Sequence, residues 1–261
     1  MKLNKILLFL LVIFAYSCEK VIQVDLNSAA PQVVIEGDIT NAAGSYQVRI
    51  SKTVNFSSGN VFPPVSQAVV KITDDTGAID SLIETSPGTY ITRSITGKPG
   101  KTYTLSVTVE GKQYSAVSTM PQPINLDSVT IEKTKIFNNT HVSAVVNFKD
   151  PIGLGNYYQF TEYLNGKLLP EVFALEDRLS DGKYVSRALF SDSSDFKDGD
   201  NIAVKMYCID KNVYDYIRTF RRVTNNGNQS ASPANPISNL SNGALGYFSA
   251  HTTQTKQVTV R

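Results

Sequence analysis

The stretch that decides the fold is TYTLSVTV, residues 102–109. Its apolar side chains alternate strictly with threonine and serine, as in a strand that buries one face. Glu110-Gly111 follows as a tight turn, and residues 112–120 return as the second strand of a hairpin. The pattern predicts antiparallel β-structure with one face against an apolar core.

The same period recurs upstream, in short runs that are separated by turn residues. These runs are residues 33–39, 46–51, 68–73, 79–84 and 89–93. With the hairpin they give about seven short strands, which is typical of an immunoglobulin-like or transthyretin-like β-sandwich. We therefore predict that residues 31–120 form such a sandwich and can fold alone.

Two prolines mark the end of this predicted domain. Met120-Pro121-Gln122-Pro123 cannot continue as a central strand, because proline has no N–H to donate to a sheet. Prolines also stiffen a connection between domains. We therefore predict a linker at residues 121–126 and a second domain at residues 127–261.

The second domain is also expected to be mostly strand. Residues 142–148 and 202–208 alternate, and Asn165-Gly166 is a strong hairpin signal. Residues 244–250 and 254–260 are predicted as two strands that close the chain. After Asp210, which can cap a helix, apolar residues recur at helical spacing, and this predicts a helix at residues 211–224. The expected fold is mostly β, with an N-terminal β-sandwich followed by a second β-sandwich-like domain that contains one helix.

Residues 1–17, MKLNKILLFLLVIFAYS, have the pattern of a secretory signal peptide. Two lysines precede an apolar run that is too short to span a bilayer, and small residues stand just before Cys18. This placement predicts cleavage and lipidation at Cys18, with residues 18–30 as a lipidated tether. The alternative is an ordinary signal peptide with a cysteine nearby. Residue 19 is Glu and not the Asp that retains lipoproteins at the inner membrane, so transfer to the outer membrane is permitted.

The charge balance argues against a nucleic-acid partner, and the cysteine count excludes an intramolecular disulfide. Of the 25 Lys and Arg residues, two lie in residues 1–17, which leaves 23 against 23 Asp and Glu. Without a basic patch, no nucleic-acid partner is expected. Cys208 is the one cysteine left after Cys18 is lipidated, so an intramolecular disulfide is excluded. Cys208 alternates inward in its predicted strand, and we expect a buried, unreactive thiol.

The acidic loop at residues 192–200 is the candidate metal site. Asp192, Asp195, Asp198 and Asp200 could offer oxygen ligands to Ca²⁺. The spacing is not that of an EF-hand, and a solvated hairpin turn is the alternative. No other cofactor is expected.

The two histidines, His141 and His251, complete no catalytic or zinc motif. The chain has no Gly-x-Ser-x-Gly, His-Glu-x-x-His or Cys-x-x-Cys sequence. A Ser-His-Asp arrangement around His251 is conceivable, but we expect structural roles for both histidines. The chain is predicted not to be an enzyme, and no catalytic residue is assigned.

Candidate binding residues come from aromatic pairs and from a long polar loop. Tyr157 and Tyr158 could stack on a glycan or anchor a peptide, with cross-strand packing as the alternative. Residues 225–243 are too polar to bury and too long for a simple connection, and Asn226 and Asn228 within them are candidates. We expect the helix and this loop to form the principal interaction surface.

Three stretches together resemble a family of Bacteroidota outer-membrane lipoproteins known as domain of unknown function 4249. They are CEKVIQVDL (18–26) with VVIEGDITN (33–41), the KTVNF…FPPVSQAVVKITD run (52–74), and NPISNLSNGALGYFSAH (235–251). DPIGLGNYY (150–158) agrees as well. The resemblance covers nearly the whole mature chain. It implies a cell-envelope lipoprotein associated with TonB-dependent transporters, and it implies no activity.

The sequence therefore leads to one expectation of function and two alternatives. We expect a non-enzymatic outer-membrane lipoprotein, lipid-anchored on the periplasmic or the cell-surface face, that is a binding accessory to TonB-dependent nutrient uptake. Its expected partners are the membrane, a TonB-dependent transporter, and a glycan or peptide ligand. The alternatives are a structural or assembly component of the envelope and a glycan-binding surface lipoprotein.

Overall fold

The structure is a computed structural model, and it describes residues 30–55, 59, 61–136, 139–190, 196–225 and 235–261. Residues Pro31–Arg261 form one compact unit. As predicted, this unit is mostly β, with three sheets and one α-helix among the described residues. None of the described helices has the length and apolar character of a membrane span.

The first half of the unit contains eight strands. They are β1 (Val33–Thr40), β2 (Gln47–Lys52), β3 (Val69–Asp74), β4 (Ile79–Ser81), β5 (Ile83–Ser86), β6 (Thr89–Ile91), β7 (Thr102–Val109) and β8 (Lys112–Thr119).

The second half contains longer strands and the helix. They are β9 (Leu126–Ile136), β10 (Asn139–Lys149), β11 (Tyr157–Leu164), β12 (Lys167–Glu176), the 3₁₀ turn η2 (Asp177–Leu179), β13 (Tyr184–Leu189), β14 (Asn201–Ile209), α2 (Lys211–Asn225) and β15 (Leu245–Thr259).

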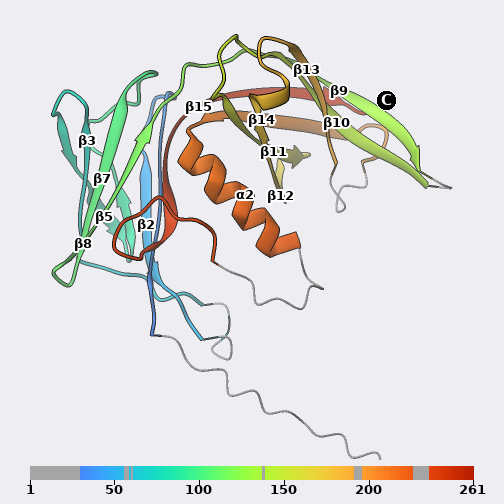
Figure 1. Cartoon of the computed structure of the whole chain (residues 1–261). Coiled ribbons are helices and arrows are strands. Elements are labelled where there is room, and N and C mark those ends of the chain that lie inside the picture. Colours follow the sequence, from blue (N-terminus) through green and yellow to red (C-terminus); the bar gives the residue numbers. More distant parts are fainter. Residues whose placement is uncertain (1–29, 56–58, 60, 137–138, 191–195, 226–234) are drawn as a thin grey trace, which may run out of the picture. The chain divides into compact units, whose positions relative to one another are not determined.

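These strands form two sandwiches that share one long sheet (Figure 1). The long sheet has the order β12-β11-β14-β15-β1-β2-β6-β5. Its β15-to-β5 part packs on the sheet β4-β3-β7-β8, and its β12-to-β15 part packs on the sheet β13-β10-β9. The predicted linker, residues 121–126, falls between β8 and the start of β9.

Strand β15 joins the two sandwiches. Leu245–His251 pair in parallel with Val34–Thr40 of β1, and Thr252–Thr259 pair antiparallel with Asn201–Cys208 of β14. One strand thus changes partner midway along its length. The sequence predicted two separate strands here, and the finding corrects this to one continuous strand of 15 residues.

Close contact between β15 and β1 depends on a glycine. Gly246 has φ +93°, and a Cβ at this position would lie 2.1 Å from the carbonyl oxygen of Ile35. Any side chain would therefore clash with the β1 backbone, and the backbone conformation itself strongly favours glycine.

The first core confirms the alternation from which the fold was predicted. Tyr103, Leu105 and Val107 of β7 are buried, and the polar residues between them are partly exposed. The same core includes Phe248 and Ala250 from β15. The predicted first domain, residues 31–120, therefore does not complete its own core.

A strand predicted at residues 79–84 is divided in the structure. β4 belongs to the four-stranded sheet and β5 to the long sheet, and Leu82 lies between them. The Leu82 amide donates to the Val70 carbonyl oxygen at 2.9 Å. The chain thus crosses from one layer to the other at a single residue, which an alternating sequence pattern cannot show.

The second core lies between the two sheets of the second sandwich. Its largest fully buried side chains include Phe148, Tyr158 and Phe160, whose rings are close neighbours. Cys208 is buried in this core as a free thiol, as the alternation at 202–208 predicts. Burial raises the pKa of this thiol.

The α-helix lies where the apolar residues change from strand spacing to helical spacing, as predicted. α2 packs on the outer face of the long sheet, against β11, β12 and β15, through Val213, Tyr214 and Ile217. Asp210 caps its start, because the Asp210 carboxylate accepts the Val213 amide at 2.9 Å. The second oxygen of Asp210 accepts from the Ser118 hydroxyl and the Thr119 amide of β8, so the cap also contacts the first sandwich.

Candidate functional site

The candidate site is a groove along the free edge of β12, here called the edge groove. β12 is the last strand of the long sheet, and β13 is the last strand of the three-stranded sheet. Residues of both strands line the same cavities, and α2 lies along β12 on the other side. In the described part of the chain, no further strand pairs with either edge. Edge strands carry outward N–H and C=O groups that can bind another strand.

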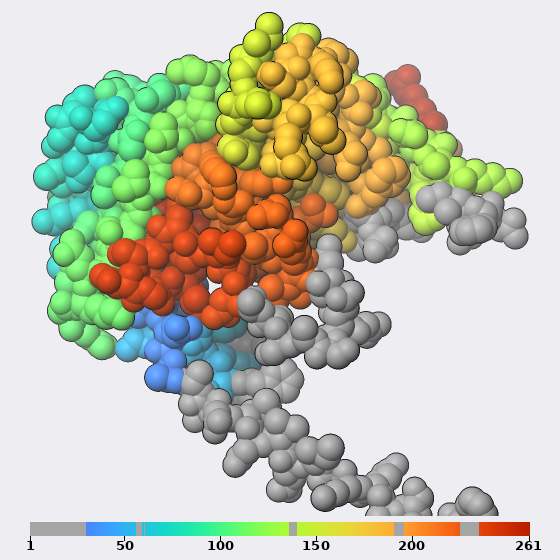
Figure 2. Space-filling view, viewed as in Figure 1, coloured from blue at the N-terminus to red at the C-terminus, as the bar shows by residue number. Residues whose placement is uncertain are grey.

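Three adjoining cavities make up the edge groove. The central cavity has a volume of about 140 Å³. A turn-side cavity of about 470 Å³ shares Leu175 and Arg187 with it. A helix-side cavity of about 410 Å³ shares Phe190 and Arg221 with it. Because neighbouring cavities share residues, the three cavities adjoin one another along β12. Figure 2 shows the surface of α2 (orange) bordering the gold surface formed by the β12–β13 segment.

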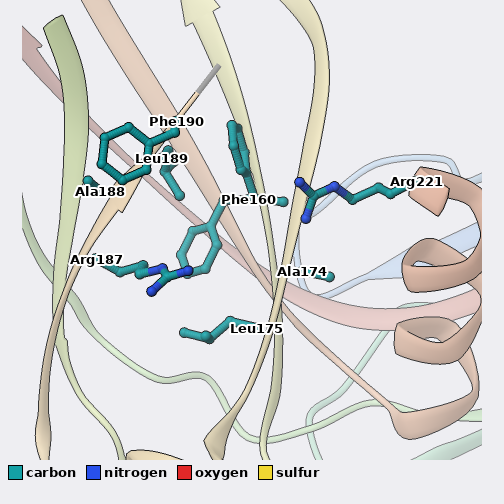
Figure 3. Close-up of a pocket in the computed structure, with 9 residues that line it drawn as sticks. Phe160, Ala174, Leu175, Arg187, Ala188, Leu189, Phe190 and Arg221 are labelled. Atoms are coloured by element: carbon teal, nitrogen blue, oxygen red, sulfur yellow. The ribbon is translucent and has the colours of Figure 1, made fainter. Parts of the chain in front are cut away.

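The floor of the central cavity is apolar (Figure 3). Phe160, Phe173 and Leu189 belong to the second core, and their side chains close the bottom of the cavity. Phe190 stands at the rim with 58% of its surface exposed. A cavity of about 150 Å³ lined in this way can hold a benzene-sized group. The central cavity therefore suits one apolar side chain.

Two guanidinium groups flank this apolar floor. Figure 3 shows Arg187, from β13, and Arg221, from α2, on opposite sides of Phe160. The Arg221 guanidinium lies 5.4 Å from the centre of the Phe173 ring, which holds it over the groove. Among the described residues, neither arginine makes a salt bridge. Both positive charges are available to an anionic group in the groove.

The turn-side cavity adds further cations and aromatic rings. Arg178, Lys183, Tyr184 and Tyr214 line it. Arg178 lies 3.6 Å from Glu176, and this exposed pair neutralises one charge. Burial raises the pKa of the Tyr214 phenol, which therefore stays neutral at physiological pH.

The helix-side cavity ends the groove. Pro170, Glu171, Phe220 and Arg221 line it together with Phe190. Pro170 explains why β12 can remain an edge strand, because a proline has no N–H for a neighbouring strand. Glu171 is the acidic residue at this end, so the groove has cations along its length and acids near its two ends.

A buried carboxyl lies next to this end of the groove. Glu162 is at the point where β11 and β12 lose register, and none of its surface is exposed. Neither of its oxygens has a hydrogen-bond partner among the described residues. Burial, and then the nearby charge of Glu171, raise the pKa of Glu162 to about 8. Glu162 is therefore largely protonated at pH 7.

A second polar cluster lies on the outer face of the long sheet. The Ser249 hydroxyl lies 2.9 Å from Nδ1 of His251, and the Tyr207 ring packs edge-on against the imidazole. Burial, and then the charge of Lys205, lower the pKa of His251 to about 3. Both Ser249 and His251 are buried, so this pair presents no hydroxyl to a substrate and is a structural contact.

The predicted binding tyrosines do not line the edge groove. Tyr158 is fully buried, and its hydroxyl donates a hydrogen bond to the Asp150 carboxylate. Tyr157 is half-buried, with its ring 5.0 Å from that of Tyr214 on α2. Burial raises the pKa of Asp150. Both rings therefore take part in packing, Tyr158 in the second core and Tyr157 against the helix.

The predicted calcium loop is only partly described. Asp198 makes a salt bridge of 3.0 Å to Lys133, and Asp200 accepts hydrogen bonds from Asn165 and the Lys197 amide. Asp192 and Asp195 lie outside the described residues. Within the described part, no group of three or more His, Cys, Asp or Glu side chains could hold a metal ion. Ca²⁺ at this loop stays a prediction.

Other predicted positions also fall outside the described residues. These are Cys18, Asn226 and Asn228. The predicted interaction surface is described at the helix, which contributes Phe220 and Arg221 to the edge groove, and at residues 235–243 of the loop. This part of the loop was predicted to be too polar to bury, but Leu240 belongs to the first core and Asn239 exchanges hydrogen bonds with the Phe248 backbone of β15.

Sequence reasoning did not find the edge groove. Arg187 and Arg221 come from segments 34 residues apart, and each looks like an ordinary surface residue in its own segment. One available signal was Pro170, which indicates an edge strand when it interrupts an apolar strand pattern after an Asn-Gly turn.

Comparison with known proteins gives a family and no activity. The search of curated proteins found no match. Residues 19–257 match the family model described as Domain of unknown function (DUF4249), and this range runs from before β1 into the last residues of β15 and includes the helix. The chain therefore belongs to the DUF4249 family.

Proposed function

We propose that this protein is a non-enzymatic, lipid-anchored outer-membrane lipoprotein that works by binding, as an accessory to a TonB-dependent nutrient-uptake system. The observation that carries the binding role is the edge groove, with its apolar floor between Arg187 and Arg221 and two free strand edges beside it. Such a site suits recognition, since the described residues that line the central cavity include no nucleophile and no acid–base pair.

The membrane anchor is proposed at Cys18 and can be tested by one substitution. Cys18→Ser should move the protein from the membrane fraction to the soluble fraction, because two or three acyl chains supply the attachment. The fold should be unchanged, because Cys18 precedes the compact unit Pro31–Arg261. Circular dichroism and thermal unfolding of the released protein check this. Full retention of Cys18→Ser in washed membranes would contradict the anchor.

The accessory role is tested by isolation of the tagged, lipidated protein from outer membranes in mild detergent. We expect a TonB-dependent transporter to be isolated with it in stoichiometric amount, and Cys18→Ser to reduce that yield. Isolation of other envelope proteins without a transporter would favour the structural alternative. Turnover of a panel of glycans, esters and peptides by the soluble protein would show an enzyme and contradict the proposal.

A further inference from the structure

We propose that the edge groove binds an extended acidic peptide segment of a partner protein, which adds as a strand to β12 and places one apolar side chain in the central cavity. This inference rests on the proposed binding function and names the chemistry of the ligand. The main chain of a peptide supplies the hydrogen bonds for such an addition, and pockets for alternate side chains supply specificity.

The length of the segment follows from β12. Pro170 cannot donate an N–H, so strand addition is limited to the part of β12 after it, residues 171–176. A strand rises about 3.3 Å per residue, so this part spans roughly 20 Å. The turn-side and helix-side cavities extend the groove beyond both ends. The groove therefore accommodates a segment of about six to nine residues.

The position of the anchor follows from the walls of the groove. Alternate side chains of an added strand point to opposite sides of the long sheet, toward β13 or toward α2. The β13 side offers the central cavity, floored by Phe160, Phe173 and Leu189. Its volume of about 140 Å³ fits one Phe or Leu side chain. The segment thus needs a large apolar residue near its middle.

The charge of the segment follows from the rim. Arg187 and Arg221 flank the anchor position, and Lys183 lines the turn-side cavity. Arg178 is balanced by its pair with Glu176. Guanidinium groups bind carboxylates through paired hydrogen bonds. An acidic residue directly next to the anchor points to the α2 side, toward Arg221, and one two positions away points to the β13 side, toward Arg187. A basic segment would meet an excess of like charge.

The probe is a fluorescein-labelled nonapeptide with blocked ends, Val-Val-Glu-Glu-Phe-Glu-Glu-Val-Val, measured by anisotropy with the full mature chain carrying Cys18→Ser. We expect saturable binding that weakens as salt is raised. A peptide with Lys in place of every Glu, and a peptide with Ala in place of Phe, should each bind at least tenfold more weakly.

Backbone recognition is tested with two N-methylated peptides. One carries N-methyl groups at the odd positions and the other at the even positions. A strand uses alternate N–H groups toward its neighbour, so one of these two peptides should lose binding and the other should keep it. Equal binding of both, or loss of both, overturns addition to the β12 edge.

Substitutions in the protein test whether the peptide binds in the edge groove. Arg187→Glu with Arg221→Glu should weaken the acidic peptide at least tenfold and strengthen the Lys peptide, a charge-swap rescue that a misfolded protein cannot give. Ala188→Phe should fill the central cavity and weaken the Phe peptide. The matched control is Arg93→Glu with Arg222→Glu, two exposed arginines outside the groove, one of them adjacent to Arg221.

Several results would overturn the inference. These are no binding at millimolar peptide, equal binding of the acidic and basic peptides, or equal loss in the control. Dimerisation that Arg187→Glu abolishes, without peptide binding, would show a second copy of the chain in the groove. If a transporter is isolated with the wild-type chain but no peptide binds, the proposed function stands and this inference fails. If the peptide binds and no transporter is isolated, this inference stands and the proposed accessory role fails.

Discussion

At the scale of single residues, the buried polar side chains carry the most information about function and stability. Glu162 and His251 are both buried. Burial raises the pKa of Glu162 and lowers the pKa of His251, so it favours the neutral form of each side chain. Asp210 is different, because its carboxylate accepts three hydrogen bonds, from β8 and from the helix. The histidine and acid positions can be read from the sequence, but their burial cannot, because it depends on which segments cover them.

Glu162→Gln should stabilise the protein at pH 8 and leave its stability nearly unchanged at pH 4.5. The folded-state pKa of about 8 lies above the ordinary value of 4.5, so the native protein loses stability as pH rises from 4.5 through 8. Glutamine has no proton to lose. The expected gain at pH 8 is up to about 4 kcal/mol, measured as the free energy of unfolding in urea.

The control for this substitution is Glu132→Gln, at an exposed position. It should leave the pH dependence of stability as in the wild type. An unchanged slope between pH 4.5 and 8 in Glu162→Gln would show that Glu162 ionises in the native protein as it does in the unfolded chain.

Cys208 should resist thiol reagents in the native protein. Its side chain is buried in the second core, and the raised pKa keeps it as the unreactive thiol. In the chain that carries Cys18→Ser, maleimide labelling should be slow in buffer and complete within minutes in denaturant. Rapid labelling of the folded protein would mean that β14 opens locally.

At the scale of secondary-structure elements, the sequence predicts a strand well when one face of the strand is apolar and the other is polar. β7 alternates between buried and half-buried residues along its whole length, and the α2 period is equally clear. The errors occur where the chain crosses from one sheet to another or where a strand changes its neighbouring strand. β4 and β5 were predicted as one strand and β15 as two, because alternation reports which face is buried and not which strand is the neighbour.

Asp210→Ala should destabilise the protein by roughly 2 kcal/mol, because it removes a helix cap and leaves polar groups of β8 without their acceptor. The midpoint of urea unfolding measures the effect. Ser118→Ala keeps the cap but removes one of the two β8 contacts and leaves the buried Ala250 amide without its acceptor, so it should also destabilise the protein. Asp198→Ala, at an exposed position, should stay within about 0.5 kcal/mol of the wild type. Equal effects of Asp210→Ala and Asp198→Ala would contradict the structural role of the cap.

At the scale of the whole molecule, the two sandwiches are joined by pairing that no local pattern reveals. β1 and β15 lie side by side although Val34 and Leu245 are far apart in the chain. The edge groove is equally non-local, since β12, β13 and α2 each supply part of it. The mostly-β fold and its helix could therefore be predicted from sequence, whereas the shared sheet and the groove could not.

Residues 31–120 expressed alone should not unfold cooperatively, although their strand pattern predicts an autonomous domain. Without β15, β1 loses a partner along its edge and the first core loses Phe248 and Ala250. Loss of a buried phenylalanine alone costs about 3–5 kcal/mol, a large part of the stability of a small domain. Circular dichroism during heating measures this. A sharp transition near that of the whole protein would show that the fragment closes its own core.

The position of β15 also has a kinetic consequence. It follows every other described strand in the chain, so during synthesis on the ribosome neither sandwich can be finished until this segment emerges. Pairing between Val34 and Leu245 then closes a loop of more than 200 residues, and contacts of such high order form slowly. A newly made chain should therefore remain open and sensitive to proteases until its final strand inserts, and both halves should then become protected at the same rate.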